Sequence, residues 1–225
     1  QSLVEKTLGM TDLPLLSEPN LQQQLVEIGY QGKKLEELEG LSATEKANML
    51  FIVQDPYTSY YDAKVVRDFV ALTQKLGFSP ILLPFKPNGK AMHIKGFLAR
   101  FSKTAKTQAE FLNRVAKLNV PLVGVDSAIV LSYRDEYKEA LGDSRGDFHV
   151  LTAHEWLTNQ LESNTLQSAV KNIAKSDRTF EWHLFPHCAE STFMPNSPKE
   201  WQYIFAQFGQ TLNVEKVGCC GMAGV

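Results

Sequence analysis

The sequence predicts an α/β fold with two similar lobes, in which helices cover parallel sheets. Candidate strands alternate with candidate helices along the chain. Several of the strands are continuous apolar runs, which is typical of strands buried on both faces of a parallel sheet. Two stretches of the chain also share one order of elements, which indicates an internal repeat.

Length and composition narrow the class of protein. The chain has 225 residues, 44% of them hydrophobic, and a formal net charge of −2. It is long enough to bury a core, and its balanced charge indicates neither a nucleic-acid partner nor a polybasic membrane anchor. The longest apolar runs fall far short of the roughly 18 residues of a transmembrane helix. Three cysteines are too few for a secreted disulfide scaffold.

The two ends of the sequence look like cut points. The chain begins at Gln1 without the pattern of a signal peptide, and it ends in the glycine-rich stretch 218–225. We therefore expect a cytoplasmic segment excised from a longer chain. The alternative is a mature protein with a flexible tail.

The elements of the first part follow from apolar runs and turn residues. Residues 1–47 are polar and predict an N-terminal arm or linker. The run 48–53 predicts a strand, after which Asp55 and Pro56 are expected to cap a turn or helix. Apolar residues at helical spacing predict a helix over 63–76, which Gly77 ends, and 79–84 predicts the next strand.

The same signals continue to the end of the chain. Helices are expected over 104–118, 133–141, 154–161, 166–174 and 198–208, and strands over 120–125, 147–152, 180–185 and 212–217. The last helix has Trp201, Ile204, Phe205 and Phe208 on one face.

The repeat divides the chain into two Rossmann-like lobes. Each contains a strand, a tight turn with proline, a helix, a second strand and a turn with glycine. Asp55 and Gly89 are 34 positions apart in the first copy, and Cys188 and Gly221 are 33 apart in the second. We expect a first lobe over 48–147 and a second lobe, truncated, over 148–225. A chance match is the alternative, since strand–helix–strand units are common.

The cysteines all lie near the end of the chain. Cys188 follows the strand at 180–185, and Cys219 and Cys220 follow the strand at 212–217. The carboxyl ends of parallel strands share one edge of a sheet, so the three thiols can approach one another.

Such thiols suit a soft metal ion or an iron–sulfur cluster, and Gly218 and Gly221 let the backbone curl closely. Three thiolates are one short of the usual set, so a fourth ligand would come from beyond Val225, from a partner or from water. Other interpretations stay open: buried structural cysteines, a zinc site completed by His183 or His187, or a redox dithiol.

The cysteine pattern resembles a known family. Cys188 followed by Cys219-Cys220-Gly221-Met222-Ala223-Gly224 is similar to the cysteine-rich CCG domain of heterodisulfide reductases and of glycolate, lactate and glycerol-3-phosphate oxidoreductases. That domain is usually a tandem of two α/β halves that holds a 4Fe–4S cluster. The resemblance implies a pseudo-duplicated CCG domain with Cys188, Cys219 and Cys220 as its metal ligands.

The first half resembles a narrower group, the C-terminal region of large bacterial FAD-linked oxidases. The resemblance lies in 53–63 (VQDPYTSYYDA), 84–90 (PFKPNGK), 124–126 (GVD) and 133–137 (YRDEY). Those chains also carry an FAD-binding portion and ferredoxin-type 4Fe–4S motifs, and they are similar to D-2-hydroxyglutarate and D-lactate dehydrogenases. The resemblance covers the chain from about residue 48 on. It implies that FAD and the ferredoxin-type domains of the parent chain, together with an electron acceptor, are partners of this segment.

The sequence departs from the family in its first half, which has no cysteine. Asp55 stands where the lone Cys would be, and Asn88-Gly89-Lys90 where the Cys-Cys-Gly would be. The first half is therefore not expected to hold a cluster. The second half stops before its final cysteines, so the 4Fe–4S cluster is expected to be absent from the isolated segment. The segment also has no flavin fingerprint, so it is expected not to turn over substrate alone.

Two classes of function follow from the resemblance. The first is an iron–sulfur electron-transfer module of a flavin-dependent oxidoreductase that oxidises D-2-hydroxy acids. The second is a docking or scaffold domain of the same enzyme that holds zinc or no cluster.

Two groups of polar residues allow a functional and a structural interpretation. Lys90, His93 and Lys95 form a basic cluster, which would hold an anion or dock a partner domain, or else lie on a solvated loop. His187 would hydrogen-bond a cluster sulfur or act as a ligand, or else it is a turn histidine with a structural role only.

Overall fold

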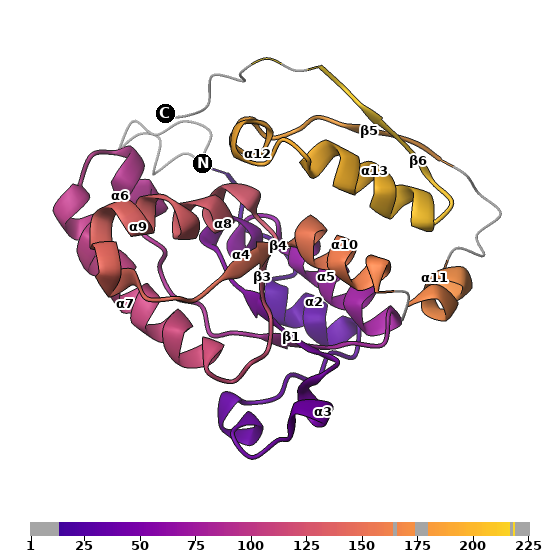
Figure 1. The fold of residues 1–225 in the computed structure, drawn as a ribbon, viewed down its shortest axis with the longest axis horizontal. Coiled ribbons are helices and arrows are strands. Elements are labelled where there is room, and N and C mark those ends of the chain that lie inside the picture. Colours follow the sequence, from indigo (N-terminus) through magenta and orange to yellow (C-terminus); the bar gives the residue numbers. More distant parts are fainter. Residues whose placement is uncertain (1–13, 164–165, 174–179, 217, 219–225) are drawn as a thin grey trace.

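Figure 1 shows the fold in a computed structural model, which describes residues 14–163, 166–173, 180–216 and 218. Within these residues the strands form a four-stranded sheet A, in the order β2-β1-β3-β4, and a two-stranded sheet B, β5-β6. All of the strand pairs are parallel. The α/β class with parallel, helix-covered sheets is thereby confirmed.

Sheet A is buried on both faces, which explains its continuous apolar runs. It consists of β1 (Met49–Val53), β2 (Ser79–Leu82), β3 (Leu122–Gly124) and β4 (Val150–Thr152). Every residue of β1 is buried. Phe51 and Val53 belong to one core and Leu50 and Ile52 to the other, as the alternation of side chains along a strand requires.

Three helices cover the first face of sheet A. They are α7 (Leu98–Ala116), α8 (Ser127–Arg134) and α9 (Glu136–Leu141), followed by the 3-10 helix η2 (Gly142–Arg145). The apolar stripe of α7 contributes Phe101, Phe111, Leu112 and Val115 to this core. Tyr133 and Tyr137 pack edge-on against each other in the same core.

The second face of sheet A is covered by α2 (Leu21–Glu27), α5 (Ala63–Lys75) and α10 (Ala153–Glu162). Trp156 of α10 lies in this core, edge-on to Phe69 and Phe78. The segment before β1 also includes η1 (Leu35–Leu38) and α3 (Ala43–Lys46), and α11 (Gln167–Ile173) follows α10.

Sheet B is a smaller unit that shares a helix layer with sheet A. It pairs β5 (Glu181–Leu184) with β6 (Thr211–Val214), and α13 (Ser197–Gln207) connects them. Helix α13 lies between sheet B and α10 (Figure 1), and its Ile204 joins the core of α5 and α10. The two sheets are therefore joined through α13.

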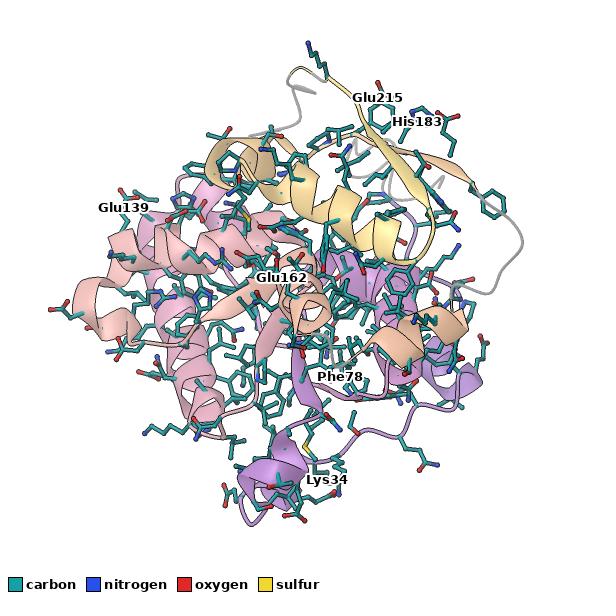
Figure 2. The ribbon with its side chains drawn as sticks, turned by 45° about the vertical axis from the view of Figure 1, so that its right-hand side comes forward. Lys34, Phe78, Glu139, Glu162, His183 and Glu215 are labelled. Carbon is teal, nitrogen blue, oxygen red and sulfur yellow. The ribbon has the colours of Figure 1, made fainter. Side chains whose placement is uncertain are left out.

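Polar side chains pair across the strands of sheet B. His183 Nδ1 lies 2.6 Å from Glu215 Oε1, and Asn213 Nδ2 donates to Glu181 Oε1 at 2.6 Å. His183 and Glu215 lie on the outer side of the sheet in Figure 2. These residues alternate with Trp182, which packs edge-on against Phe205 of α13. The sheet therefore presents its polar face to solvent.

The two strand–helix–strand units share the same pairing register. Met49 pairs with Ser79, and Glu181 pairs with Thr211, so both pairings join residues 30 positions apart. Matching Met49 to Glu181 shifts the numbering by 132 (181 minus 49) and aligns β1 with β5 and β2 with β6. The same shift aligns α4 (Pro56–Tyr60) with α12 (Cys188–Phe193), and α5 with α13.

This register changes the predicted alignment of the two units by one residue. The shift of 132 matches Asp55 to His187 and Pro56 to Cys188, one residue away from the match of Asp55 to Cys188. Asp55 and His187 have equivalent roles, because each accepts a hydrogen bond at the start of the following helix.

The four-stranded sheet crosses the expected lobe boundary. Strand β4 pairs with β3, and α10 covers the same sheet, so residues 150–162 belong to sheet A although the second lobe was expected to begin at 148. The boundaries 48–147 and 148–225 stay a prediction. Helices α6 (Lys90–Ile94), α8 and α12 were not expected from the sequence. No described helix is both long enough and apolar enough to cross a membrane.

Candidate functional site

The carboxyl ends of the sheet A strands carry side chains that begin the next helices. Asp55 follows β1 and accepts a hydrogen bond from the Thr58 N–H at 2.9 Å, which confirms its predicted capping role. Asp126 follows β3 and accepts from the backbone N–H groups of Ala128 and Ile129 at 2.8 and 3.1 Å. In open α/β sheets this edge is where ligands bind, above all where the strand order reverses. Here the reversal lies between β1 and β3.

Two carboxylates lie near each other at this reversal point. Burial raises the pKa of Asp55 above its ordinary value, and hydrogen bonds from Thr58 oppose the rise. The nearby charge of Asp126 raises the pKa of Asp55 further. Burial also raises the pKa of the Tyr133 phenol, and the charges of Asp55 and Asp126 raise it further. Tyr133 therefore stays neutral over the physiological range.

Cys188 is the one predicted metal ligand that the described residues include. It is a free, exposed cysteine at the first position of α12, just after the end of β5. The adjacent His187 caps this helix, its Nδ1 accepting a hydrogen bond from the Ala189 N–H at 3.3 Å. His187 thus serves the turn in this structure, whereas His183 pairs with Glu215 on the outer side of sheet B.

Cys219 and Cys220 lie outside the described residues. Among the described residues, no group of three or more His, Cys, Asp or Glu side chains could hold a metal ion.

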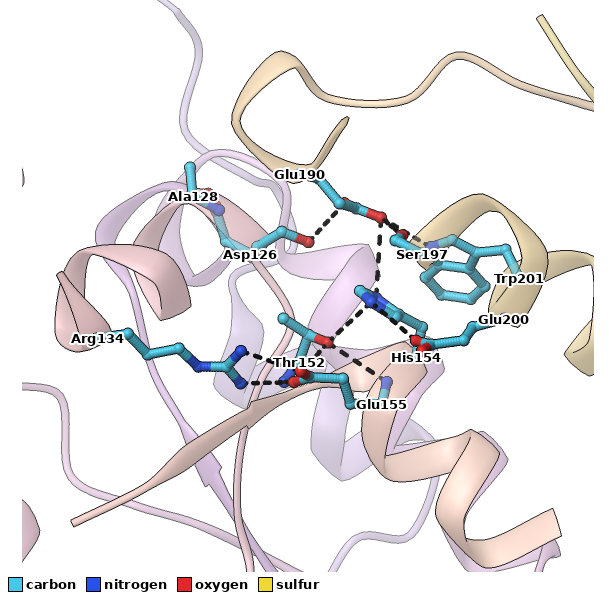
Figure 3. A network of polar contacts seen from close by, with 11 residues as sticks. Asp126, Ala128, Arg134, Thr152, His154, Glu155, Glu190, Ser197, Glu200 and Trp201 are labelled. Carbon is cyan, nitrogen blue, oxygen red and sulfur yellow. Dashed lines mark hydrogen bonds and ion pairs between the residues drawn. The ribbon is translucent and has the colours of Figure 1, made fainter. Parts of the chain in front are cut away.

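The buried carboxylate of Glu190, two positions after Cys188, connects α12 to helices α8 and α13 (Figure 3). Glu190 is only 7% exposed. Its Oε2 accepts a hydrogen bond from Ser127 Oγ at 2.7 Å, and its Oε1 accepts one from Trp201 Nε1 at 3.2 Å and one from Ser197 Oγ. Ser127 begins α8, and Ser197 and Trp201 belong to α13.

His154 lies at the centre of the same network and is 1% exposed. Its Nε2 is 3.2 Å from Thr152 Oγ1 and 3.4 Å from Glu200 Oε2, and its Nδ1 is 3.9 Å from Glu190 Oε1. Burial lowers the pKa of His154 below its ordinary value, although the carboxylates of Glu190 and Glu155 oppose this effect. The imidazole is therefore neutral at pH 7.

Helix α10 begins with a capping box whose acid also binds an arginine. The Thr152 and Glu155 side chains bond each other's backbone N–H groups. Arg134 of α8 donates to both carboxylate oxygens of Glu155, at 3.0 and 2.5 Å. Burial acts to raise the pKa of Glu155, but hydrogen bonds from Arg134 and Thr152 hold it below its ordinary value.

Two residues of the predicted basic cluster, Lys90 and His93, lie on helix α6, and Lys95 is its C-cap. Lys90 Nζ forms an ion pair with Glu136 of α9, and His93 Nδ1 lies 3.9 Å from the same carboxylate. The His93 ring packs on Phe101, whereas Lys95 is exposed. Two of the three basic residues are thus used within the fold, which leaves less charge for an anion.

Apart from Trp201, expected on the apolar face of its helix, the residues of the buried network were not singled out from the sequence. Asp126-Ser127 after a strand, and Thr152 three residues before Glu155, carry recognisable helix-start signals. Glu190 carries no comparable signal, because its partners come from other helices, from α8 far earlier in the chain and from the following helix α13.

Comparison with known proteins gives one consistent result. The chain is similar over its whole length to D-2-hydroxyglutarate dehydrogenases. It is 82% identical over 225 residues to the one from Haemophilus influenzae, 57% over 224 residues to that from Escherichia coli and 34% over 224 residues to that from Pseudomonas putida. These alignments cover 100% of this chain but 22%, 21% and 21% of the relatives. The chain thus spans about a fifth of the relatives' length. No protein-family model and no solved structure matches it.

Proposed function

We propose that the chain is a segment of a D-2-hydroxyglutarate dehydrogenase and forms its iron–sulfur electron-transfer module. The observation that carries the proposal is similarity over the whole chain to relatives with this name. Their names favour D-2-hydroxyglutarate over D-lactate as the acid that the parent enzyme oxidises. The FAD and the ferredoxin-type clusters are assigned to the rest of the parent chain, so the segment alone is inactive.

The proposed ligands of the cluster are Cys188, Cys219 and Cys220. Leu184 and Val214 are paired at the ends of β5 and β6, and Cys188 and Cys219 follow them by four and five positions. Adjacent strands lie about 4.8 Å apart, and five residues reach at most about 17 Å. The thiols are therefore within reach of one another.

The first repeat unit supports this arrangement. There the segment after β2 packs back on the segment after β1: Gln54 Nε2 donates to the Leu83 carbonyl at 2.7 Å, and the rings of Tyr60 and Phe85 lie 5.1 Å apart. The shift of 132 matches Pro87-Asn88-Gly89 of this segment to Cys219-Cys220-Gly221. If the second unit follows the first, its cysteine pair approaches α12, which Cys188 begins.

A cluster held by these thiolates would carry single electrons between the flavin and the electron acceptor. The chain's own residues supply the ligands and their support. Cys188 is exposed at the first position of α12, and His187 is the N-cap of this helix. The fourth ligand is assigned to the parent chain beyond Val225, to a partner or to water.

The test uses the full-length parent enzyme. Cys188→Ser, Cys219→Ser and Cys220→Ser are compared with Ser191→Ala, an exposed position on the same helix, after anaerobic reconstitution with iron and sulfide. We expect each cysteine variant to lose iron equivalent to about one four-iron cluster, with the matching visible absorption, and the control to lose none. Loss of zinc instead would indicate a zinc site, and unchanged metal content a docking domain. Either result would contradict the electron-transfer module.

A further inference from the structure

We propose that Glu190 is a positioning residue that fixes helix α12, and with it Cys188, to the body of sheet A. The part that concerns Cys188 as a ligand rests on the proposed function. The anchoring of α12 rests on the structure alone.

The contacts of Glu190 join three helices through one side chain. Ser127 Oγ at the start of α8 donates to Oε2 at 2.7 Å, while Ser197 Oγ and Trp201 Nε1 of α13 donate to Oε1, the latter at 3.2 Å. Helix α8 packs on sheet A, and α13 packs on sheet B. The carboxylate therefore links α12 to both sheets.

Glu190 is the buried residue of α12. The helix has six residues, and its apolar Phe193 is 64% exposed. Helices this short are not stable by themselves and depend on tertiary contacts. Within α12 no apolar side chain is buried, so the anchor inside the helix is polar, and the buried Met194 follows at the C-cap.

The environment suits a carboxylate that stays in place. Burying a charged oxygen is unfavourable unless donors compensate it, and here three donors point at the two oxygens. Removal of the carboxylate would leave Ser127, Ser197 and the Trp201 indole without this acceptor. Cys188 precedes Glu190 by two residues on the same helical turn, so loosening of the anchor moves the thiol.

The experiment compares Glu190→Ala, Glu190→Gln and the exposed control Glu110→Gln in the full-length holoenzyme. Glutamine keeps one acceptor oxygen for Trp201 and Ser197, and the Ser127 hydroxyl can rotate to accept from the new amide. Hydrogen–deuterium exchange of the amides of 188–193 is measured, together with the midpoint potential and EPR line shape of the cluster. For Glu190→Ala we expect exchange at least about tenfold faster and a changed potential and line shape. Glutamine and the control are expected to stay near wild type.

Two results separate this inference from the proposed function. If Cys188→Ser changes no metal content, the cluster assignment fails, and exchange in α12 still tests the anchor. Wild-type exchange and wild-type labelling of Cys188 by a thiol reagent in Glu190→Ala would overturn the role of Glu190. Should Glu190→Ala not fold, Ser127→Ala, which removes one donor, is expected to accelerate α12 exchange in the folded protein. Unchanged exchange in that variant would overturn the proposal equally.

Discussion

At the scale of single residues, the polar side chains at the carboxyl edge of sheet A cap the following helices or connect one helix to another. Asp55 and Asp126 follow strands and Thr152 ends one, and the side chain of each accepts a hydrogen bond from the first turn of the next helix. Glu190 and His154 then join these helices to the C-terminal unit. The polar side chains at this edge thus bond the first backbone N–H groups of the helices and fix the helices relative to one another.

Gly89 is a residue whose backbone and surroundings both require glycine. It has a φ of +80°, and an added Cβ would lie 2.9 Å from Cδ2 of the buried Phe101. Gly96 has a similar φ of +75° but nothing within 4 Å of an added Cβ. The left-handed conformation costs an alanine roughly 1–2 kcal/mol at either position.

We therefore expect Gly89→Ala to lower the free energy of unfolding by about 1–3 kcal/mol more than Gly96→Ala does, because only the former overpacks the core. Urea unfolding of the two variants measures the difference. Equal losses would show that Phe101 yields to the added methyl group.

His154 predicts a pH dependence of stability. Its folded pKa is lower than its ordinary value of 6.5, so the unfolded state takes up a proton first as the pH falls. Stability is therefore complete above about pH 6.5 and decreases below it, by at most about 1.4 kcal/mol per pH unit for this group.

Replacement by glutamine tests the contribution of His154. Glu190, Glu200, Glu155 and Arg134 all face this site, so the relevant quantity is the difference between wild type and His154→Gln. The variant is expected to be less stable at pH 7.5 but to lose less stability between pH 7 and 5, as followed by urea unfolding. Parallel pH profiles would contradict the assignment.

At the scale of elements, long periodic segments were predictable and short capped helices were not. The helix 63–76 and the strand 48–53 correspond to α5 and β1 within a residue or two. Helix α8 was missed because its start depends on the Asp126 cap, and α12 because its anchor lies in other elements. Helix α9 begins at Glu136, three residues after its predicted start, because residues 133–134 belong to α8.

The tryptophans of α10 and β5 allow a matched test of packing. Trp156 is 1% exposed between Phe69 and Phe78, whereas Trp182 is 46% exposed on sheet B. We expect Trp156→Ala to cost about 3–5 kcal/mol of unfolding free energy and Trp182→Ala clearly less. Chemical denaturation of both variants checks this, and a larger loss for Trp182→Ala would mean that sheet B carries more of the stability than its burial indicates.

At the scale of the whole molecule, the two strand–helix–strand units have the same order of elements but are covered by neighbouring elements to different extents. The unit of β1, α5 and β2 lies within a sheet covered on both faces. The unit of β5, α13 and β6 has two strands, and the packing of α13 against α10 covers its helix. The second unit therefore depends on the first for its stability.

A peptide of residues 180–216 is accordingly expected to remain unfolded. Two strands and two helices, one of them only six residues long, bury too little apolar surface. Chains below about 40 residues rarely fold without a disulfide or metal. Circular dichroism during urea titration should show no cooperative transition, whereas the same segment within the whole chain unfolds with it. A cooperative transition of the peptide would show that sheet B is an independent domain.

The sequence by itself determined the α/β class and the order of most elements, because apolar periodicity and turn residues are local signals. It also indicated that Asp55 caps the segment after β1. Only the tertiary structure decided that β4 extends sheet A, that the repeat aligns Asp55 with His187, and that Glu190 meets Ser127, Ser197 and Trp201. These features depend on contacts between different strands and helices, and their pairing is set by how these elements pack rather than by any local pattern.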